Sequence, residues 1–252
     1  MERVDLDQVS WALFSVDVEL NGSIVRADSD PGVIQWSGSA RYTVGAEDYD
    51  EQDFPEGEDA PRWDTAIAKG RALSLHEQQQ DYACWSVLQM SGVLVDLGTL
   101  VGDVVEQLDS ISADYEAFSP VFAGNELHPD LLEMVEGFGN RVVLIDRVNL
   151  APAWRGAGGV GRVLISRILG LFTSTDTGVV ATIPYPIVLF DESARLDLEQ
   201  HPRFGEELER VRRVWASIGF RPYRNDIWVM DPAKVHHDNG VRAIEARLPG
   251  LR

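Results

Sequence analysis

The feature that most constrains the fold of this chain is a glycine-rich turn between a strand-like and a helix-like segment. Residues 142–145, Val-Val-Leu-Ile, form a continuous apolar run, as in a central strand covered on both faces. The turn, residues 155–161, reads Arg-Gly-Ala-Gly-Gly-Val-Gly. Apolar residues then recur at helical spacing over residues 162–172. The pattern predicts a strand over residues 141–150, a turn and a helix in immediate succession.

A glycine-rich turn that opens directly into a helix is suited to hold an anion. Glycines let the backbone approach a bulky group closely. The first N–H groups of a helix have no intrahelical partners, and the helix dipole adds partial positive charge at that end. The side chains of Arg155 and Arg162 can add further charge. We therefore predict that the amides of residues 156–161 form a cradle for a pyrophosphate.

Two other interpretations of the turn stay open. Residues 156–161 match the dinucleotide fingerprint G-x-G-x-x-G literally. However, the next predicted strand, residues 179–183, leads into Pro-Tyr-Pro instead of an acidic residue that would hold a ribose. The turn can also be a structural element that binds nothing. A P-loop is excluded, because no Gly-Lys-Ser/Thr follows the glycines.

The remaining pattern predicts a single α/β domain over residues 1–252. Asn-Gly at residues 21–22 indicates a tight hairpin turn, and Gly219 a left-handed helix cap. Because a strand, a helix and a second strand follow one another, residues 141–150 and 179–183 should pair in parallel. Further predicted strands are 11–20, 32–44, 65–75 and 227–230, and further predicted helices are 97–107, 113–118, 129–135 and 206–218.

The charge of the chain limits its partners. There are 22 basic and 41 acidic residues, so the formal net charge is −19. Such a surface repels nucleic acids and anionic membranes, and it favours cationic partners or high solubility. Acidic residues are densest over residues 47–59, which predicts a solvated loop rather than a metal site.

Cysteine and histidine give no sign of a metal. Cys84 is the single cysteine, which excludes an internal disulfide and a multi-cysteine zinc site. His236 and His237 are adjacent and show no ligand spacing, so we expect them on extended chain in a solvated tail. The sequence has no signal-peptide pattern and no apolar run near the ~20 residues that span a bilayer. These observations predict a cytoplasmic protein.

The residues around the turn resemble the GCN5-related N-acetyltransferase superfamily. Residues 152–158, Pro-Ala-Trp-Arg-Gly-Ala-Gly, are similar to its Pro-x-Tyr/Trp-Arg-Gly-x-Gly turn, and Gly-Arg-Val-Leu at 161–164 to the helix that follows. Val-Trp-Ala-Ser-Ile-Gly-Phe at 214–220 is similar to its last helix and terminal Gly-Phe. The resemblance covers residues 140–232. It implies a mixed, centrally splayed sheet that is flanked by helices and completed by N-terminal antiparallel strands.

The resemblance also implies where a co-substrate binds. The strand 141–150 should splay from the strand 179–183, and acetyl-CoA or another acyl-CoA should lie in the gap. Its pyrophosphate would lie on the turn and its pantetheine along residues 148–150. The implied cofactor-binding residues are Val148, Asn149, Leu150, Arg155, Gly156, Ala157, Gly158, Gly159, Val160, Gly161 and Arg162.

The chain departs from the family pattern in three places. Between Gly158 and Gly161 the turn has one residue more than the Arg-x-x-Gly-x-Gly/Ala spacing. Trp215 stands where the last helix often carries a tyrosine that protonates the leaving thiolate, and an indole cannot act as that acid. The antiparallel hairpin that usually precedes the central strand is absent, since residues 122–140 look like loop and helix. The N-terminal strands must therefore complete the sheet.

Asp146 is the predicted general base, because an amine that arrives as an ammonium ion must lose a proton. It alternates with Leu144 and Val148, so its carboxylate should share a face with apolar groups, and burial should raise its pKa. A salt bridge to Arg147 or to another arginine is an equally open interpretation. A bulge in the strand, expected in this superfamily, would reverse the facing of Asp146. Tyr223, just past the last helix, is the predicted acid. Tyr185 is a second choice, and proton transfer from solvent is a further alternative.

These observations predict an acyl-CoA-dependent N-acetyltransferase that acts on a small amine or a basic peptide. The alternative is a catalytically degenerate module of the same fold, which binds acyl-CoA or a protein partner without turnover. Net charge alone favours a third function, mimicry of nucleic acid. An exposed strand edge is compatible with a homodimer. The domain divides into a β-rich part (1–95), a helical segment (96–140), an acyl-CoA-binding core (141–232) and a tail (233–252).

Overall fold

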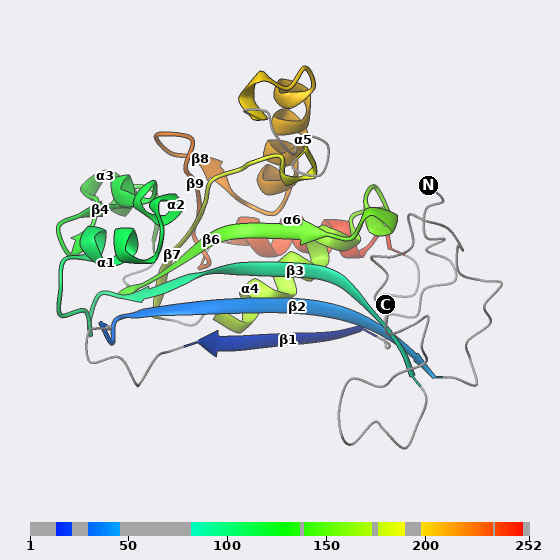
Figure 1. The fold of residues 1–252 in the computed structure, drawn as a ribbon, viewed down its shortest axis with the longest axis horizontal. Coiled ribbons are helices and arrows are strands. Elements are labelled where there is room, and N and C mark those ends of the chain that lie inside the picture. Colours follow the sequence, from blue (N-terminus) through cyan, green and yellow to red (C-terminus); the bar gives the residue numbers. More distant parts are fainter. Residues whose placement is uncertain are drawn as a thin grey trace.

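A seven-stranded mixed sheet organises the chain, in the order β1-β2-β3-β6-β7-β9-β8 (Figure 1). Neighbouring strands are antiparallel except β6 and β7, which pair in parallel as expected. The strands are β1 Phe14–Asn21, β2 Val33–Gly45, β3 Tyr82–Asp96, β6 Arg141–Leu150, β7 Thr177–Thr182, β8 Arg221–Pro222 and β9 Trp228–Met230. The computed structural model describes residues 14–21, 30–45, 82–136, 139–172, 176–189, 198–233 and 235–248.

Helices flank this sheet, which makes the fold an α/β fold. The helices of the described residues are α1 Val104–Ile111, α2 Ala113–Glu116, α3 Pro129–Leu132, α4 Val160–Phe172, α5 Phe204–Ser217 and α6 Val235–Glu245. The first three belong to the segment that joins β3 to β6, which we call the insert (residues 97–140). The insert also holds a small hairpin of β4 (Phe122–Ala123) and β5 (Glu126–Leu127). None of the helices described is long and apolar enough to cross a bilayer.

The sheet has a buried cluster on each face. On one side, which we call the α4 face, Trp36 and Ile145 pack with side chains of α4, α5 and α6. On the other side, the insert face, Val93 and Leu144 pack with the insert. Figure 1 shows the insert gathered at one end of the sheet. Farther along the insert face, the residues of β2 and β3 that alternate with those of the α4 face are polar: Gln35, Ser37, Gln89 and Ser91.

Hydrogen bonds tie the insert to the sheet at both of its ends. At its entry and exit, Asp96 and Arg141 are cross-strand partners, and their side chains form an ion pair of 3.1 Å. At the far edge of the sheet, the Glu136 amide donates to Asp231 Oδ2 at 2.6 Å. The Arg221 side chain donates to the Met134 carbonyl oxygen at 2.8 Å. The insert therefore bridges β3 and the β8–β9 hairpin across the insert face.

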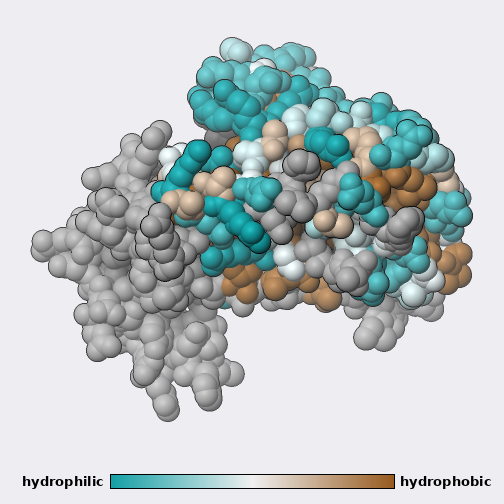
Figure 2. All heavy atoms as spheres, turned by 180° about the vertical axis from the view of Figure 1, so that it is seen from behind, coloured by the Kyte–Doolittle hydropathy of each residue, from teal (hydrophilic) through white to brown (hydrophobic). Residues whose placement is uncertain are grey.

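Helix α5 presents a polar outer surface. Its exposed residues include Glu206, Glu209 and Arg213, while Trp215 is 4% exposed and packs on Phe220 with ring centroids 4.7 Å apart. Seen from behind, the surface over α5, at the top of the view, is almost entirely hydrophilic (Figure 2). One face of the helix thus packs on the sheet and the other meets solvent.

Several sequence predictions are confirmed. Strand β6 has the predicted bounds, and α4 and α5 lie within two residues of theirs. Gly219 has φ 100°, and the Phe220 amide donates to the Trp215 carbonyl oxygen at 3.1 Å, as in a glycine-capped helix end. Strand β3, from the N-terminal part, pairs with β6 and extends the sheet as expected.

Other predictions are wrong. The helix predicted over residues 97–107 begins only at Val104, because the Asp103 side chain caps it by accepting from the amides of Val105 and Glu106. Strand β3 was not predicted at all. Residues 235–245 form α6 and not an extended tail, and Ile244 and Leu248 are buried.

Some predictions fall outside the described residues. They are the turn at residues 21–22, the strand at 65–75, the acidic loop at 47–59, and the side chains of Cys84, His236 and His237.

Candidate functional site

The parallel pairing of β6 with β7 ends half-way along β6. It runs from Arg141 opposite Thr177 to Ile145 opposite Thr182, where the Thr182 hydroxyl donates to the Ile145 carbonyl oxygen at 3.3 Å. Beyond this point β6 continues to Leu150 and pairs only with β3. The ribbons of β6 and β7 diverge here in Figure 1. Residues 146–150 thus have one edge without a strand partner in the described part of the chain.

Backbone groups of β6 point toward this unpaired edge. The Ala151 amide donates to the Val87 carbonyl oxygen of β3 at 2.9 Å, so Ala151 directs its backbone groups toward β3. In an antiparallel ladder such residues alternate with residues whose backbone groups point away. Val148 and Leu150 therefore direct their amide and carbonyl groups to the unpaired edge. The Leu150 carbonyl oxygen accepts from Arg155 Nε at 2.8 Å, whereas the described residues give Val148 no partner there.

The glycine turn follows directly, and it folds on itself more tightly than expected. Gly156, Gly158 and Gly159 have φ values of 77°, 52° and 112°. As a result, the amides of residues 157–160 bond to carbonyl oxygens within or just before the turn. Among the described residues, the amides of Gly156 and Gly161 have no partner. The cradle is therefore narrower than the predicted run of six amides.

Two arginines lie on either side of this turn. Arg155 is directed to the end of β6, where its Nη2 also donates to Asn149 Oδ1 at 3.3 Å. Arg162 donates to Ser217 Oγ of α5 at 3.3 Å. Its guanidinium lies next to Gly159, because a Cβ built there would be 2.9 Å from Arg162 Nη2. Arg162 therefore puts positive charge beside the turn.

Close packing also explains two of the glycines. A Cβ at Gly159 would lie 2.6 Å from Ile244 Cγ2 of α6, and one at Gly161 would lie 2.8 Å from Leu150 Cδ2. Such distances are shorter than van der Waals contact allows. Packing thus favours glycine at 159 and 161 independently of any ligand, and at Gly159 the φ of 112° adds to this. Helix α6 borders the turn on one side.

A β-bulge places Asp146. Ile145 is opposite Gly92 and Arg147 is opposite Ser91, so Asp146 is the extra residue of β6. Because of the bulge, Leu144 packs on the insert face and Val148 on the α4 face. The prediction that both share a face with Asp146 is therefore wrong for Val148. Since Ile145 and Val148 face α4, both Asp146 and Arg147 lie on the insert face.

The carboxylate of Asp146 is half-buried and has no hydrogen-bond or ion-pair partner among the described residues. Burial raises its pKa, the charge of Arg147 opposes this effect, and the charge of Asp114 adds to it. The described residues provide neither a hydrogen bond nor an ion pair to Asp146, so the predicted alternative, a salt bridge to Arg147, is not formed. A carboxyl group with a raised pKa at the point where two strands separate has the properties of a general base.

Sequence reasoning missed a second polar group on this face, Tyr115 of α2. Tyr115 is 7% exposed and belongs to the same buried cluster as Leu144. Burial raises the pKa of its hydroxyl, and the charge of Asp146 raises it further. No local sequence signal links Tyr115 to Asp146, because only the folding of the insert over the sheet brings them together.

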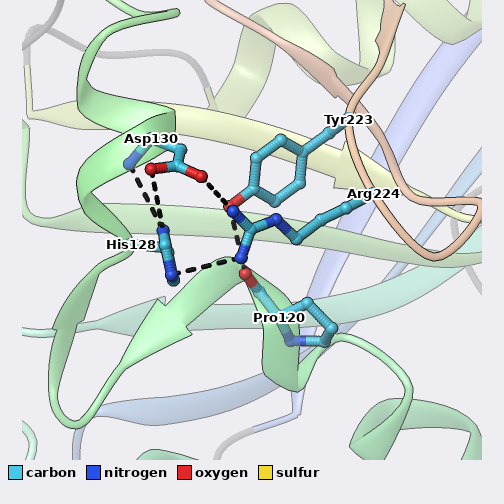
Figure 3. A network of polar contacts seen from close by, with 5 residues as sticks. All are labelled: Pro120, His128, Asp130, Tyr223 and Arg224. Carbon is cyan, nitrogen blue, oxygen red and sulfur yellow. Dashed lines mark hydrogen bonds and ion pairs between the residues drawn. The ribbon is translucent and has the colours of Figure 1, made fainter.

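Tyr223, the predicted acid, lies in a different network (Figure 3). Its hydroxyl donates to the Pro120 carbonyl oxygen at 3.3 Å. Burial raises its pKa, and Arg224 opposes this effect. Arg224 pairs with Asp130, and its Nη1 lies 3.1 Å from His128 Nε2. The Tyr223 hydroxyl is thus engaged with the insert and not with Asp146.

Comparison of the chain with protein-family models, curated proteins and solved structures gives no match. A proposal for the function therefore rests on the sequence and on the geometry of the site.

A groove between α5 and the β8–β9 hairpin is separate from this site. Its lining includes Arg212, Arg224 and Trp228. Arg212 pairs with Glu209 and with Asp226, at 2.9 and 2.7 Å. The groove thus has largely neutralised walls and includes neither the turn nor Asp146. No group of three or more side chains suited to bind a metal occurs in the part of the chain that the structure describes.

Proposed function

We propose that this protein is an acyl-CoA-dependent N-acetyltransferase of the GCN5-related type, which acts on a small amine. The observation that carries the proposal is the unpaired edge of residues 146–150, directly before the glycine turn and α4. Residues in this position have free backbone groups for an extended, amide-containing chain, and the turn has free amides for a pyrophosphate. The bulge at Asp146 and the separation of β6 from β7 are both features that the family resemblance implies.

Pantetheine contains two amide groups and can pair with the backbone of Val148 as an added strand would. The pyrophosphate would then lie at the amides of Gly156 and Gly161, beside Arg162. The distribution of charge along the chain supports binding of the anionic pyrophosphate at the turn. Residues 141–232 carry 12 basic and 11 acidic residues, so the whole of the net charge of −19 arises from the rest of the chain. The proposed co-substrate side therefore lacks the repulsion that the whole chain suggests.

In the proposed reaction, Asp146 accepts a proton from the ammonium group of the acceptor. The freed amine forms a bond to the thioester carbonyl carbon and passes its second proton to solvent, the carbon–sulfur bond breaks, and CoA leaves as a thiolate. Trp215 is buried and cannot donate a proton. Solvent therefore protonates the thiolate, which is a good leaving group.

Binding and turnover together test this proposal. Calorimetry with CoA should show binding, and acetyl-CoA mixed with a panel of amines should release free thiol. Arg162→Gln should weaken CoA binding about tenfold, or ~1.4 kcal/mol, since it removes the charge beside the turn. Arg167→Gln is the matched control on the same helix, because Arg167 pairs with Glu245 at 3.7 Å and does not contact the turn. If the unmodified protein binds no CoA, the proposal is wrong.

A second candidate function has a specific observation in its favour. The hydroxyl of Tyr223 is bound to Pro120 and Trp215 supplies no acid, so neither residue is poised to protonate the leaving group. A non-catalytic module that binds acyl-CoA would need no such acid. CoA binding without thiol release on any amine would favour this function.

A further inference from the structure

The hydroxyl of Tyr115 lies on the same face of the sheet as the Asp146 carboxylate. Tyr115 is on α2 of the insert, and it belongs to the buried cluster of the insert face together with Leu144 of β6. Asp146 lies two residues beyond Leu144, and the bulge keeps it on that face. The two groups thus approach one another from an insert helix and from the central strand.

The Tyr115 hydroxyl has no partner within the described part of the protein. The residue as a whole is 7% exposed, and no hydrogen bond to its oxygen is present there. The oxygen is not among the fully enclosed unpaired polar atoms, which are Trp36 Nε1, Trp154 Nε1 and Arg212 Nε. A buried ring whose hydroxyl is open and has no protein partner can exchange a bond to water for a bond to a ligand.

Electrostatics agree with this proximity. Apart from burial, the largest influence on the pKa of Tyr115 is the charge of Asp146, which raises it. The phenol therefore stays neutral at physiological pH and can both accept and donate a hydrogen bond. Asp114 and Arg147 are the other charged groups that act on both residues.

On the basis of the proposed N-acetyltransferase function, we propose that the Tyr115 hydroxyl and the Asp146 carboxylate together bind the acceptor as a primary ammonium group. A primary ammonium has three N–H donors, so it can donate to the carboxylate and to the phenol oxygen at once. When Asp146 takes one proton, the bond to Tyr115 holds the nitrogen in place. Tyr115 is then a substrate-binding residue, and Asp146 is the base.

The side chains around Asp146 narrow the class of primary amines that fit the site. Beyond Asp146, the insert face of β3 presents Gln89 and Ser91, and that of β2 presents Gln35 and Ser37. These side chains offer hydrogen bonds and little apolar area. The acceptor is therefore a polar primary amine, and an arylalkyl or long aliphatic amine fits the site less well.

A matched pair of ligands tests the ammonium site without turnover. Ethanolamine and choline carry the same hydroxyethyl group and the same charge, but choline has no N–H donor. In ligand-observed NMR titrations, ethanolamine should bind the unmodified protein more tightly than choline. Tyr115→Phe should weaken ethanolamine binding about fivefold or more and change choline binding little. Asp146→Asn should weaken the binding of both ligands, because both are cations. Equal binding of the two ligands, or unchanged ethanolamine binding by Tyr115→Phe, would overturn the inference.

The same variants separate this inference from the proposed function. With acetyl-CoA, Tyr115→Phe should raise the KM for primary amines while kcat and the Kd of CoA stay within twofold. Asp146→Asn should lower kcat. Asp109→Asn is the control, because it removes an exposed charge of α1 that is not among the charges acting on the pKa of Tyr115 or Asp146. Absence of CoA binding would defeat the acetyltransferase proposal alone, whereas unchanged amine recognition in both variants would defeat the ammonium site alone.

Discussion

The carboxylate of Asp146 is held where charge is unfavourable, and this has a measurable effect on stability. Burial raises its pKa, so between its unfolded pKa near 3.8 and the raised folded value the native state binds more protons. Stability therefore falls as pH rises through that window. Asp146→Asn should raise the melting temperature at pH 7, and the gain should disappear as the pH falls to 3.8 or below. A scanning-calorimetry series over pH measures this, and a gain independent of pH would contradict burial of the charge as its cause.

At Asp30, hydrogen bonds to the carboxylate outweigh the effect of burial on its pKa. It is 8% exposed and accepts from the amides of Gly32, Val101 and Gly102 at 2.8, 2.9 and 2.6 Å. Burial raises its pKa, but these three hydrogen bonds outweigh burial and hold the pKa below its usual value. Its stabilisation is thus present above the unfolded pKa and is lost as pH falls through the lowered folded pKa. Asp30→Ala should lower the free energy of unfolding by about 2–3 kcal/mol in urea titrations at pH 7, and by less in acid.

At the scale of elements, the bulge of β6 depends on a glycine in its partner strand. A Cβ at Gly92 would collide with the Leu144 carbonyl oxygen and lie 2.7 Å from Trp36 Cζ2. Gly92→Ala should therefore destabilise the protein by about 2 kcal/mol or more. Gly170→Ala on α4 is the control, because a Cβ there would meet nothing within 4 Å. In chemical denaturation it should stabilise by roughly 0.5–1 kcal/mol, and an equal response of the two variants would refute the steric cause.

Elements were predictable where the sequence pattern was local. Strand β6, the turn and α4 follow from an apolar run, glycines and helical periodicity, each within a few residues. Strand β3 escaped prediction because its alternation breaks at a bulge opposite Ala40 and Arg41: the adjacent residues Val87 and Leu88 both pack in the cluster of the α4 face. The apolar stripe that predicted a helix from residue 97 is real, since Leu97 and Leu100 do pack on the same cluster. Leu97 and Leu100 lie before the helix, because Asp103 is its N-cap and the helix begins at Val104.

The candidate site was predictable only in part, for the same reason. Asp146 and the turn belong to one continuous stretch, so their neighbourhood follows from the chain itself. Tyr115 reaches Asp146 only through the path of the insert, which no local pattern specifies. The facing of Val148 depends on the bulge, and the self-bonded amides of residues 157–160 depend on the φ values of the glycines. These are tertiary properties.

At the scale of the molecule, α6 links the C-terminal residues to the turn. Ile244 is 6% exposed and packs within the α4-face cluster, next to Gly159. Ile244→Ala leaves a cavity between α6 and α4, which should cost about 2–4 kcal/mol. Thermal unfolding of this variant and of Ala246→Gly, an exposed change just after α6, measures the difference. Similar small losses in both would mean that α6 is not held by core packing.

The way the insert joins the sheet has a consequence for how such a protein can change over time. The insert leaves after Asp96 and returns at Arg141, two residues that already face each other across a strand pair. A change of length between them does not by itself shift the strand register, the bulge or the turn, as long as the insert still covers the buried cluster around Val93 and Leu144. Tyr115 belongs to the exchangeable stretch and Asp146 does not. Mutations in the insert could thus change which acceptor is bound, while Asp146 and the glycine turn stay the same.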